Sequence, residues 1–171
     1  VTNSGESSDY VNGQPVYHKP LPIISIPTIL GSLSEMTFGM YLYDKYDEVY
    51  KECADSNIYV KDCIIDPTLY ETVPVKYSLS SALSVFALSF DIYMSSSLNV
   101  INEPLIKYSM QTSISGINKM IIDAANIDNI SSMSIANMLC AISACNANFG
   151  AIRALSIALN GGCSGNKSIV C

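Results

Sequence analysis

The stretch SLSSALSVFALSFDIY, at residues 78–93, decides the fold of this chain. No charged side chain occurs between Lys76 and Asp91, and apolar residues recur at the spacing of an α-helix. Ser78 is a candidate N-cap, and Pro74 prevents a much earlier start. The run is too short to span a bilayer, so it predicts a buried core helix. Its expected buried face comprises Leu79, Ala82, Leu83, Phe86, Ala87 and Phe90.

Composition and charge limit the classes of protein that the chain can represent. Its 171 residues suit one ordinary domain, and an apolar fraction of 49% is enough for a core. The net charge of −6 and the few, unclustered Lys and Arg residues argue against nucleic-acid binding. The first ten residues are polar and acidic, unlike a signal peptide, so the expected location is intracellular, cytoplasmic or mitochondrial.

The cysteines are expected to be reduced thiols. Disulfide frameworks belong mostly to short secreted chains without a core, and this chain has the composition for a core. No C-x-x-C pair occurs and His18 is the only histidine, so a structural zinc site is not expected. The six cysteines are Cys53, Cys63, Cys140, Cys145, Cys163 and Cys171.

Residues 129–152 carry no charge and are long enough to cross a bilayer. Ser and Asn side chains recur throughout this stretch, which is unfavourable for a helix that faces lipid. We therefore expect no membrane span.

The rest of the chain divides into short strands followed by helices. Apolar β-branched runs predict strands at residues 21–28, 38–43 and 61–66, with a loop over residues 1–19 and a polar connection at 44–50. Helical periodicity predicts further helices at 103–125, 130–146 and 149–159, the second capped by Asp128 or Asn129 and the last ended by Gly161 and Gly162. The predicted fold class is α/β followed by all-α.

Several blocks of sequence resemble the iron-containing alcohol dehydrogenases, which have a dehydroquinate synthase-like fold. They are PLPIISIPTILGSLSEMTFGMYLYD at 20–44, DCIIDPTLYETVP at 62–74, PVKYSLSSALSVFALSFDIY at 74–93 and MLCAISACNANFGAIRALSIALN at 138–160. The resemblance implies a truncated relative. Residues 1–66 would be the remnant of a nucleotide-binding domain with few strands, and residues 67–171 the first helices of a helical domain.

In that family, the turn between the first two strands lies along the nicotinamide cofactor. The resemblance implies cofactor contacts for Thr28, Gly31, Ser32 and Ser34, with Glu35 also in keeping, and Lys51 near the family lysine that touches the ribose. Leu33 replaces a family glycine, which opposes close approach of the cofactor. We therefore expect no bound cofactor, and NAD(P) is the cofactor that the resemblance would allow. The alternative is an ordinary strand–loop–strand corner.

The family's metal ligands are replaced in this sequence. The resemblance aligns Ser84, Leu88, Arg153 and Lys167 with them, and Ile157 with a histidine near the reacting centre. A hydroxyl is a poor ligand for a divalent ion and an aliphatic chain is none, so we expect the metal site to be lost and the pocket repacked as core. Arg153 then either occupies the vacated position as a cation held by Asp91 or another carboxylate, or extends its head to solvent. The second interpretation is favoured.

Three functional hypotheses follow. The first is a non-catalytic structural or interaction subunit, with a protein partner or as a homo-oligomer, because truncation exposes apolar surface. The second is an NAD(P)-dependent alcohol oxidoreductase, as the resemblance implies, with the rest of its site supplied by residues or chains elsewhere. The third is a small-molecule binding module that retains part of the cofactor turn, residues 28–35.

Overall fold

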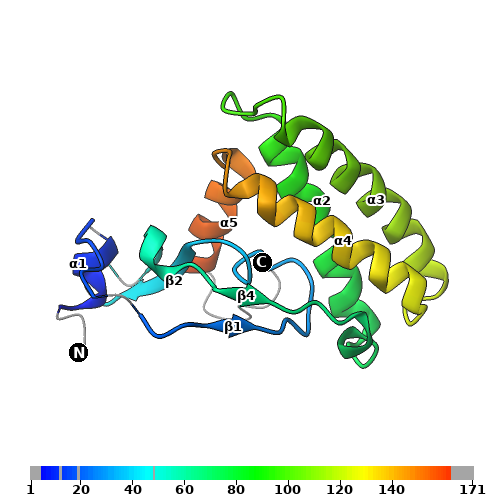
Figure 1. The fold of residues 1–171 in the computed structure, drawn as a ribbon, viewed down its shortest axis with the longest axis horizontal. Coiled ribbons are helices and arrows are strands. Elements are labelled where there is room, and N and C mark those ends of the chain that lie inside the picture. Colours follow the sequence, from blue (N-terminus) through cyan, green and yellow to red (C-terminus); the bar gives the residue numbers. More distant parts are fainter. Residues whose placement is uncertain (1–4, 12, 19, 48, 163–171) are drawn as a thin grey trace.

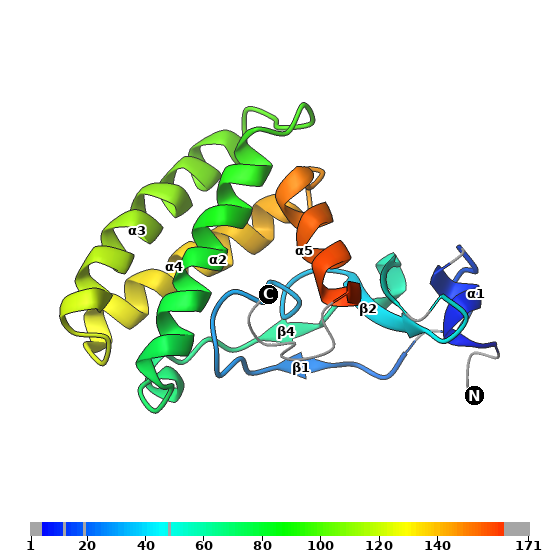
Figure 2. The ribbon, with the colours of Figure 1, turned by 180° about the vertical axis from the view of Figure 1, so that it is seen from behind.

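The computed structural model describes residues 5–11, 13–18, 20–47 and 49–162 of the chain. Short strands occupy the first part of the chain and long helices the second, which confirms the predicted fold class. The helices α2, α3 and α4 pack against one another, and we call this group the helix layer. In Figure 1, α4 crosses in front of α2, and the strands lie below the helix layer. Seen from behind, α5 (Ala151–Gly162) lies between α2 and the strand β2 (Figure 2).

The strands form two separate pairs. β1 (Ile24–Ser25) and β4 (Asp62–Cys63) are parallel, whereas β2 (Gly39–Asp44) and β3 (Val49–Ala54) form an antiparallel hairpin with Tyr43 opposite Tyr50. β1 and β4 lie within predicted strands but are only two residues long, whereas β2 extends one residue past its predicted end, into Asp44. The sequence does not predict β3, because charged residues interrupt its apolar pattern.

The predicted buried strand at residues 21–28 is wrong in its burial. Ile24 and Ile26, on one face of the run, are 59% and 52% exposed, and Ile23 on the alternate face is 47% exposed. A run that is apolar on both faces is typical of a parallel strand covered on both sides. Within the described residues, β1 pairs only with β4, and no further strand continues their sheet.

The expectation of a loop over residues 1–19 is also corrected. α1 (Ser7–Val11) packs against the hairpin, where the Cys53 thiol donates to the Tyr10 carbonyl at 3.5 Å. Two short 3-10 helices, η1 (Ser56–Ile58) and η2 (Pro67–Tyr70), flank β4. Each follows an aspartate whose side chain accepts a backbone N–H, which is a turn that the short polar side chain of Asp favours.

The helix α2 (Val75–Tyr93) confirms the central prediction of the sequence, with two corrections. It begins three residues earlier than expected, with Pro74 rather than Ser78 at the N-cap. Its buried face is also offset from the predicted one, since Leu83 and Phe90 are 54% and 42% exposed. Between Lys76 and Asp91 the helix has no charged side chain to mark its outer face, so small side chains decide which face packs closely. The buried face comprises Ser81, Ala82, Val85, Leu88, Ser89, Asp91 and Ile92.

The other two helices of the layer are α3 (Asn102–Ile122) and α4 (Ile127–Ala144). Asn126, not Asp128 or Asn129, caps α4 by accepting the backbone N–H groups of those two residues. Ser109 of α3 shares a 2.9 Å hydrogen bond with Ser89 of α2 and donates to the Ala136 carbonyl of α4 at 2.7 Å. Buried hydroxyls thus join all three helices.

Within the described residues, no helix has both the length and the hydropathy to cross a membrane. The uncharged stretch considered for this role is broken after α4 by a turn at residues 145–150 and continues into α5. α5 extends through Gly162, so its predicted end before Gly161 is corrected.

Candidate functional site

A cavity of about 610 Å³ lies between the hairpin, α2, α5 and the turn at residues 31–34. Its volume falls within the range of pockets for drug-sized molecules. The expectation that this region is repacked as core is therefore wrong. The lining residues are Gly31, Ser32, Ser34, Thr37, Gly39, Tyr41, Tyr50, Ser80, Leu83, Ser84, Ala87, Leu88, Ile152, Arg153, Ser156 and Ile157.

The turn that closes one side of the cavity is held by a buried polar contact to α4. The Gly31 N–H donates to the Asn137 side-chain oxygen at 3.1 Å, and the Asn137 amide donates to Glu35 at 2.6 Å. Both Asn137 and Glu35 are buried. Gly31 and Leu33 have φ values of +92° and +57°, the left-handed conformation that suits glycine and rarely a branched side chain. The buried side chain of Leu33 anchors the turn in the core.

The predicted cofactor residues do not all meet at this cavity. Gly31, Ser32 and Ser34 line it, and the two serine hydroxyls are hydrogen-bonded to each other. Thr28 is exposed and is not among the lining residues. The Gly31 N–H, one of the backbone donors with which such a turn could bind a phosphate, is already bonded to Asn137.

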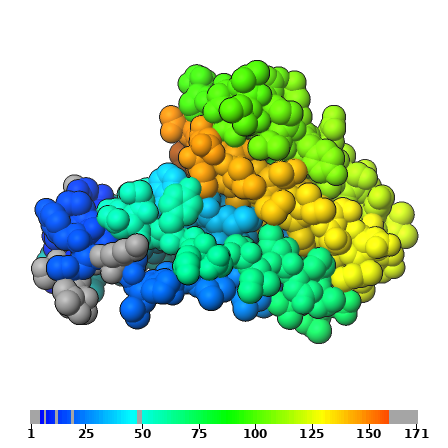
Figure 3. All heavy atoms as spheres, in the orientation of Figure 1, coloured from blue at the N-terminus to red at the C-terminus, as the bar shows by residue number. Residues whose placement is uncertain are grey.

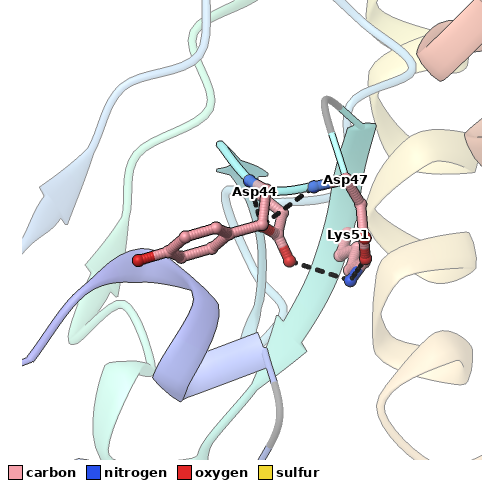
Figure 4. Close-up of polar contacts among 4 residues, drawn as sticks. Asp44, Asp47 and Lys51 are labelled. Atoms are coloured by element: carbon pink, nitrogen blue, oxygen red, sulfur yellow. Dashed lines mark hydrogen bonds and ion pairs between the residues drawn. The ribbon is translucent and has the colours of Figure 1, made fainter.

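Lys51 lies on the other face of the hairpin. Tyr50 lines the cavity, and successive side chains of a strand point to opposite faces. The Lys51 ammonium group binds Asp44 at 2.8 Å and also contacts Asp47 (Figure 4). This contact lowers the pKa of Asp44 and raises that of Lys51. The lysine therefore stabilises its own hairpin, and the structure brings it to no other predicted cofactor residue.

Three of the four aligned metal positions lie together at the cavity. Ser84 and Leu88 come from α2 and Arg153 from α5, with Ile157 one turn further along; Lys167 lies outside the described residues. The Ser84 hydroxyl donates to the Ser80 carbonyl at 3.1 Å. A hydroxyl, a leucine and a cationic guanidinium do not fit a divalent metal ion. In the described chain, no three His, Cys, Asp or Glu residues are grouped to hold one.

Arg153 is enclosed by protein, so the interpretation in which its head reaches solvent is wrong. Its side chain is only 12% exposed. One guanidinium nitrogen, Nη2, donates to Glu52 at 2.9 Å, and the group lies over the rings of Phe149 and Tyr41 at 4.2 and 5.3 Å from their centroids. Its Nε–H is buried and has no hydrogen-bond partner among the described residues. The carboxylate that holds this cation is Glu52 of the hairpin, rather than Asp91.

Asp91 instead holds the backbone of α5. One of its carboxylate oxygens accepts the N–H groups of Gly150 and Arg153, and the other accepts that of Ile152. These groups belong to the first turn of the helix, where backbone donors lack intrahelical partners. Gly150 permits this approach, because a Cβ there would lie 2.7 Å from Asp91. The carboxylate of α2 therefore sets where α5 begins and where it presents Arg153.

Sequence patterns did not identify several residues of this site. Tyr41 and Glu52 face each other across the hairpin, and both contact Arg153. The alternation in GMYLYD places Tyr41 and Tyr43 on one face of β2, which was the available signal. Asp91 is the only charge in α2 after Lys76, which was the signal for its capping role.

The described cysteines are free thiols, namely Cys53, Cys63, Cys140 and Cys145. Burial raises the pKa of Cys140 in α4 to about 12, which keeps this thiol protonated. Cys163 and Cys171 lie outside the described residues.

No family model matches this sequence, and no curated protein matches it either. Solved structures do match its fold. Alcohol dehydrogenase from Oenococcus oeni aligns at a TM-score of 0.89 and 21% identity over 99% of this chain and 44% of that one. Iron-containing alcohol dehydrogenase from Thermotoga maritima aligns at 0.83 and 20% identity, over 95% of this chain and 44% of that one.

Sulfoacetaldehyde reductase from Bifidobacterium kashiwanohense, solved with NAD+, aligns at a TM-score of 0.85 and 19% identity over 93% of this chain and 42% of that one. The chain thus spans less than half the length of these proteins. At this level of identity the comparisons establish the fold alone. The resemblance read from the sequence is confirmed to that extent, because the chain has the fold of a part of the iron-containing alcohol dehydrogenase structures.

Proposed function

We propose that this chain is a non-catalytic interaction subunit, and that its partner is a protein whose strands continue the β1–β4 sheet. The observation that carries this proposal is the exposure of that sheet. Five apolar side chains, which we call the β1–β4 surface, are between 47% and 86% exposed: Leu21, Ile23, Ile24, Ile26 and Ile64. In Figure 3, the segments that contain β1 and β4 lie next to each other in the lower part of the molecule.

Parallel sheets occur almost only with both faces covered. In β1 both faces are exposed, and within the described residues each strand also has one unpaired edge. Burying these half-exposed side chains would contribute on the order of 1 kcal/mol each, and edge pairing would add backbone hydrogen bonds. A partner that adds an apolar strand would pair with a free edge of this sheet. Helices of the same partner would cover the exposed faces.

The chemistry of the cavity supports the non-catalytic part of the proposal. The aligned metal positions hold a hydroxyl, an aliphatic chain and a guanidinium, which together do not form a divalent metal site. Lys51 is engaged with Asp44 and Asp47 on the opposite face of the hairpin. A metal-dependent alcohol oxidation therefore has no apparent ligand set in the described residues.

The test is the native mass of the protein isolated from its source cells, with the co-purifying chains identified. We expect a stable complex that is larger than the 18.5 kDa of the chain alone and contains an α/β partner. Amide hydrogen exchange of residues 21–26 and 62–64 should be slower in the complex than in the purified chain. Charging the surface with Ile24→Lys should release the partner and leave the circular dichroism spectrum unchanged.

Ile122→Lys is the matched control. Ile122 is 87% exposed, at the end of α3 and outside the β1–β4 surface, so its substitution should leave the complex intact. Equal loss of the partner in both variants would contradict the assignment of the surface. A chain that stays monomeric in its source extract would overturn the proposal, and a homodimer through this surface would replace the proposed partner with a second copy.

A second candidate is an NAD(P)-dependent alcohol oxidoreductase whose remaining site residues come from outside the described chain. The cavity between the turn at residues 31–34 and α5 favours it, together with the fold shared with dehydrogenases. The purified protein would be incubated with Fe²⁺ or Zn²⁺, NAD(P)+ and simple alcohols while the absorbance of the reduced nicotinamide is followed. Metal-dependent turnover would contradict the non-catalytic proposal.

A further inference from the structure

Among the described residues, the lining of the cavity carries one positive charge and no negative charge. Arg153 is the one charged side chain of this described lining, which contains no Asp or Glu. The remaining lining consists of apolar, hydroxyl and glycine residues, with Leu83 and Leu88 on the α2 wall and Ile152 and Ile157 on the α5 wall. A pocket of this kind matches a molecule with an apolar body and one anionic end.

The guanidinium of Arg153 is held in a fixed orientation before any ligand arrives. Phe149 and Tyr41 lie against it, and Glu52 accepts one of its hydrogen bonds. Arginine presents five N–H donors in a planar fork that matches a carboxylate. Because the side chain is already ordered, a ligand that binds it loses little additional conformational freedom.

Glu52 satisfies only part of this fork. Its contact uses Nη2 alone, and the Nε–H has no hydrogen-bond partner among the described residues. The Glu52 side chain is 32% exposed and is not among the cavity-lining residues. It can therefore turn towards water when a second carboxylate approaches the guanidinium from the cavity.

From this geometry we propose that the cavity binds a small amphipathic carboxylate, with its anionic group on Arg153 and its apolar body against α2 and α5. Glu52 is the resident counter-ion that the ligand displaces or shares. The site is separate from the β1–β4 surface, so this proposal does not depend on the proposed function.

The test uses phenylbutyrate and phenylbutanol, which share an apolar skeleton and differ in the charge of the end group. In calorimetric titration of the full chain, we expect phenylbutyrate to bind roughly tenfold more tightly, the effect of about one charge-assisted hydrogen bond. Arg153→Met should remove this preference and leave the affinity for phenylbutanol unchanged. Equal affinities in the unmodified protein, or no measurable binding of phenylbutyrate at millimolar concentration, would overturn the proposal.

Glu52→Gln provides a test that does not rely on removing the arginine. It frees Arg153 from its competing carboxylate, so the affinity for phenylbutyrate should rise several-fold while that for phenylbutanol stays the same. Ala87→Phe, which fills the cavity from α2, should abolish binding of both probes. An unchanged affinity in Glu52→Gln, or undiminished binding in Ala87→Phe, would place the carboxylate elsewhere and refute the assignment.

Discussion

Gly31 combines a left-handed backbone with close packing against α2. Alanine at this position would have a strained φ, and its Cβ would lie 3.2 Å from the Ser81 carbonyl oxygen and 3.4 Å from the Ser84 Cβ. Gly13 has a similar φ of +95° with no atom near its would-be Cβ. Gly13→Ala should therefore cost about 1–2 kcal/mol from backbone strain alone, and Gly31→Ala should cost about 1 kcal/mol more. Urea unfolding of both variants measures the difference, and equal losses would mean that α2 yields to the added methyl group.

Tyr70 makes stability depend on pH in the alkaline range. Burial, more than the nearby carboxylates and thiol, raises the pKa of its phenol to about 12. Because the folded-state pKa lies above the usual value of about 10, its contribution is fully present below pH 10 and is lost as the pH rises through about 12. Tyr70→Phe should flatten the fall in the free energy of unfolding over this range.

The control for Tyr70 is Tyr17→Phe, which removes an exposed phenol and leaves Tyr70 in place. In Tyr17→Phe, the free energy of unfolding should still fall as the pH rises from about 10 to about 12. An equal fall in Tyr70→Phe would show that another group titrates in this pH range.

At the level of single residues, the sequence predicted which side chains stand at the aligned metal positions, but it did not predict their environment. Arg153 was expected to reach solvent, because long cationic side chains usually do. Its enclosure depends on Tyr41 and Glu52, which are more than 100 positions away in the chain and adjacent in β-sheet register. No local pattern contains that information.

α5 depends on one carboxylate for its start. Asp91→Ala would leave the N–H groups of Gly150, Ile152 and Arg153 without their acceptor, at a cost of about 1–2 kcal/mol. Since α5 carries one wall of the cavity, the amides of α5 should exchange faster in this variant than in the unmodified protein. Hydrogen exchange with mass spectrometry measures this local effect.

Asn126→Ala supplies the comparison for the cap of α5. Asn126 caps α4 through a similar contact on the exposed side of the helix layer. It should cost about 1 kcal/mol and leave exchange in α5 unchanged. Faster exchange of α5 in both variants would show that the helix responds to global stability rather than to Asp91.

The elements themselves differ in how far the sequence could predict them. The four long helices were predicted because their periodicity extends over several turns. β3 was missed because Lys51 and Glu52 break its apolar pattern. In the structure these two side chains bind β3 to other elements, Lys51 to Asp44 and Glu52 to Arg153. The buried face of α2 was misplaced because no charged side chain between Lys76 and Asp91 marks the outer face. Packing against α3 and α5 decides the rotation of the helix.

Thiol accessibility reports how the whole molecule opens. Cys140 is fully buried in α4 and its pKa is raised to about 12, whereas Cys63 in β4 is partly exposed. Iodoacetamide should therefore modify Cys63 in the native protein and Cys140 only when the helix layer unfolds. The measurement is peptide mapping over a urea series. Modification of Cys140 in the absence of urea, at the rate of Cys63, would show that the helix layer opens locally.

On the scale of the molecule, the sequence predicted a strand-rich beginning and a helical remainder, and the structure confirms that order. The division into domains at residues 66 and 67, the compartment and the partner remain predictions. The cavity was not foreseen, since its volume depends on how the hairpin, α2 and α5 lie relative to one another. Substitutions of the four aligned ligands suggested a filled pocket, yet the side chain of Ser84 is small, and the hairpin holds Arg153 at one wall.

The pairing of β1 with β4 also bears on the order in which the chain folds. Ile24 pairs with Asp62, and Ser25 with Cys63, across an intervening segment that contains the whole β2–β3 hairpin. Closing so long a loop costs chain entropy, and strands of two residues form too few hydrogen bonds to offset much of that cost. The hairpin and the helices, whose contacts are local, are therefore expected to form early. The parallel pair should assemble last, so that a newly made chain exposes its isoleucines throughout most of its folding.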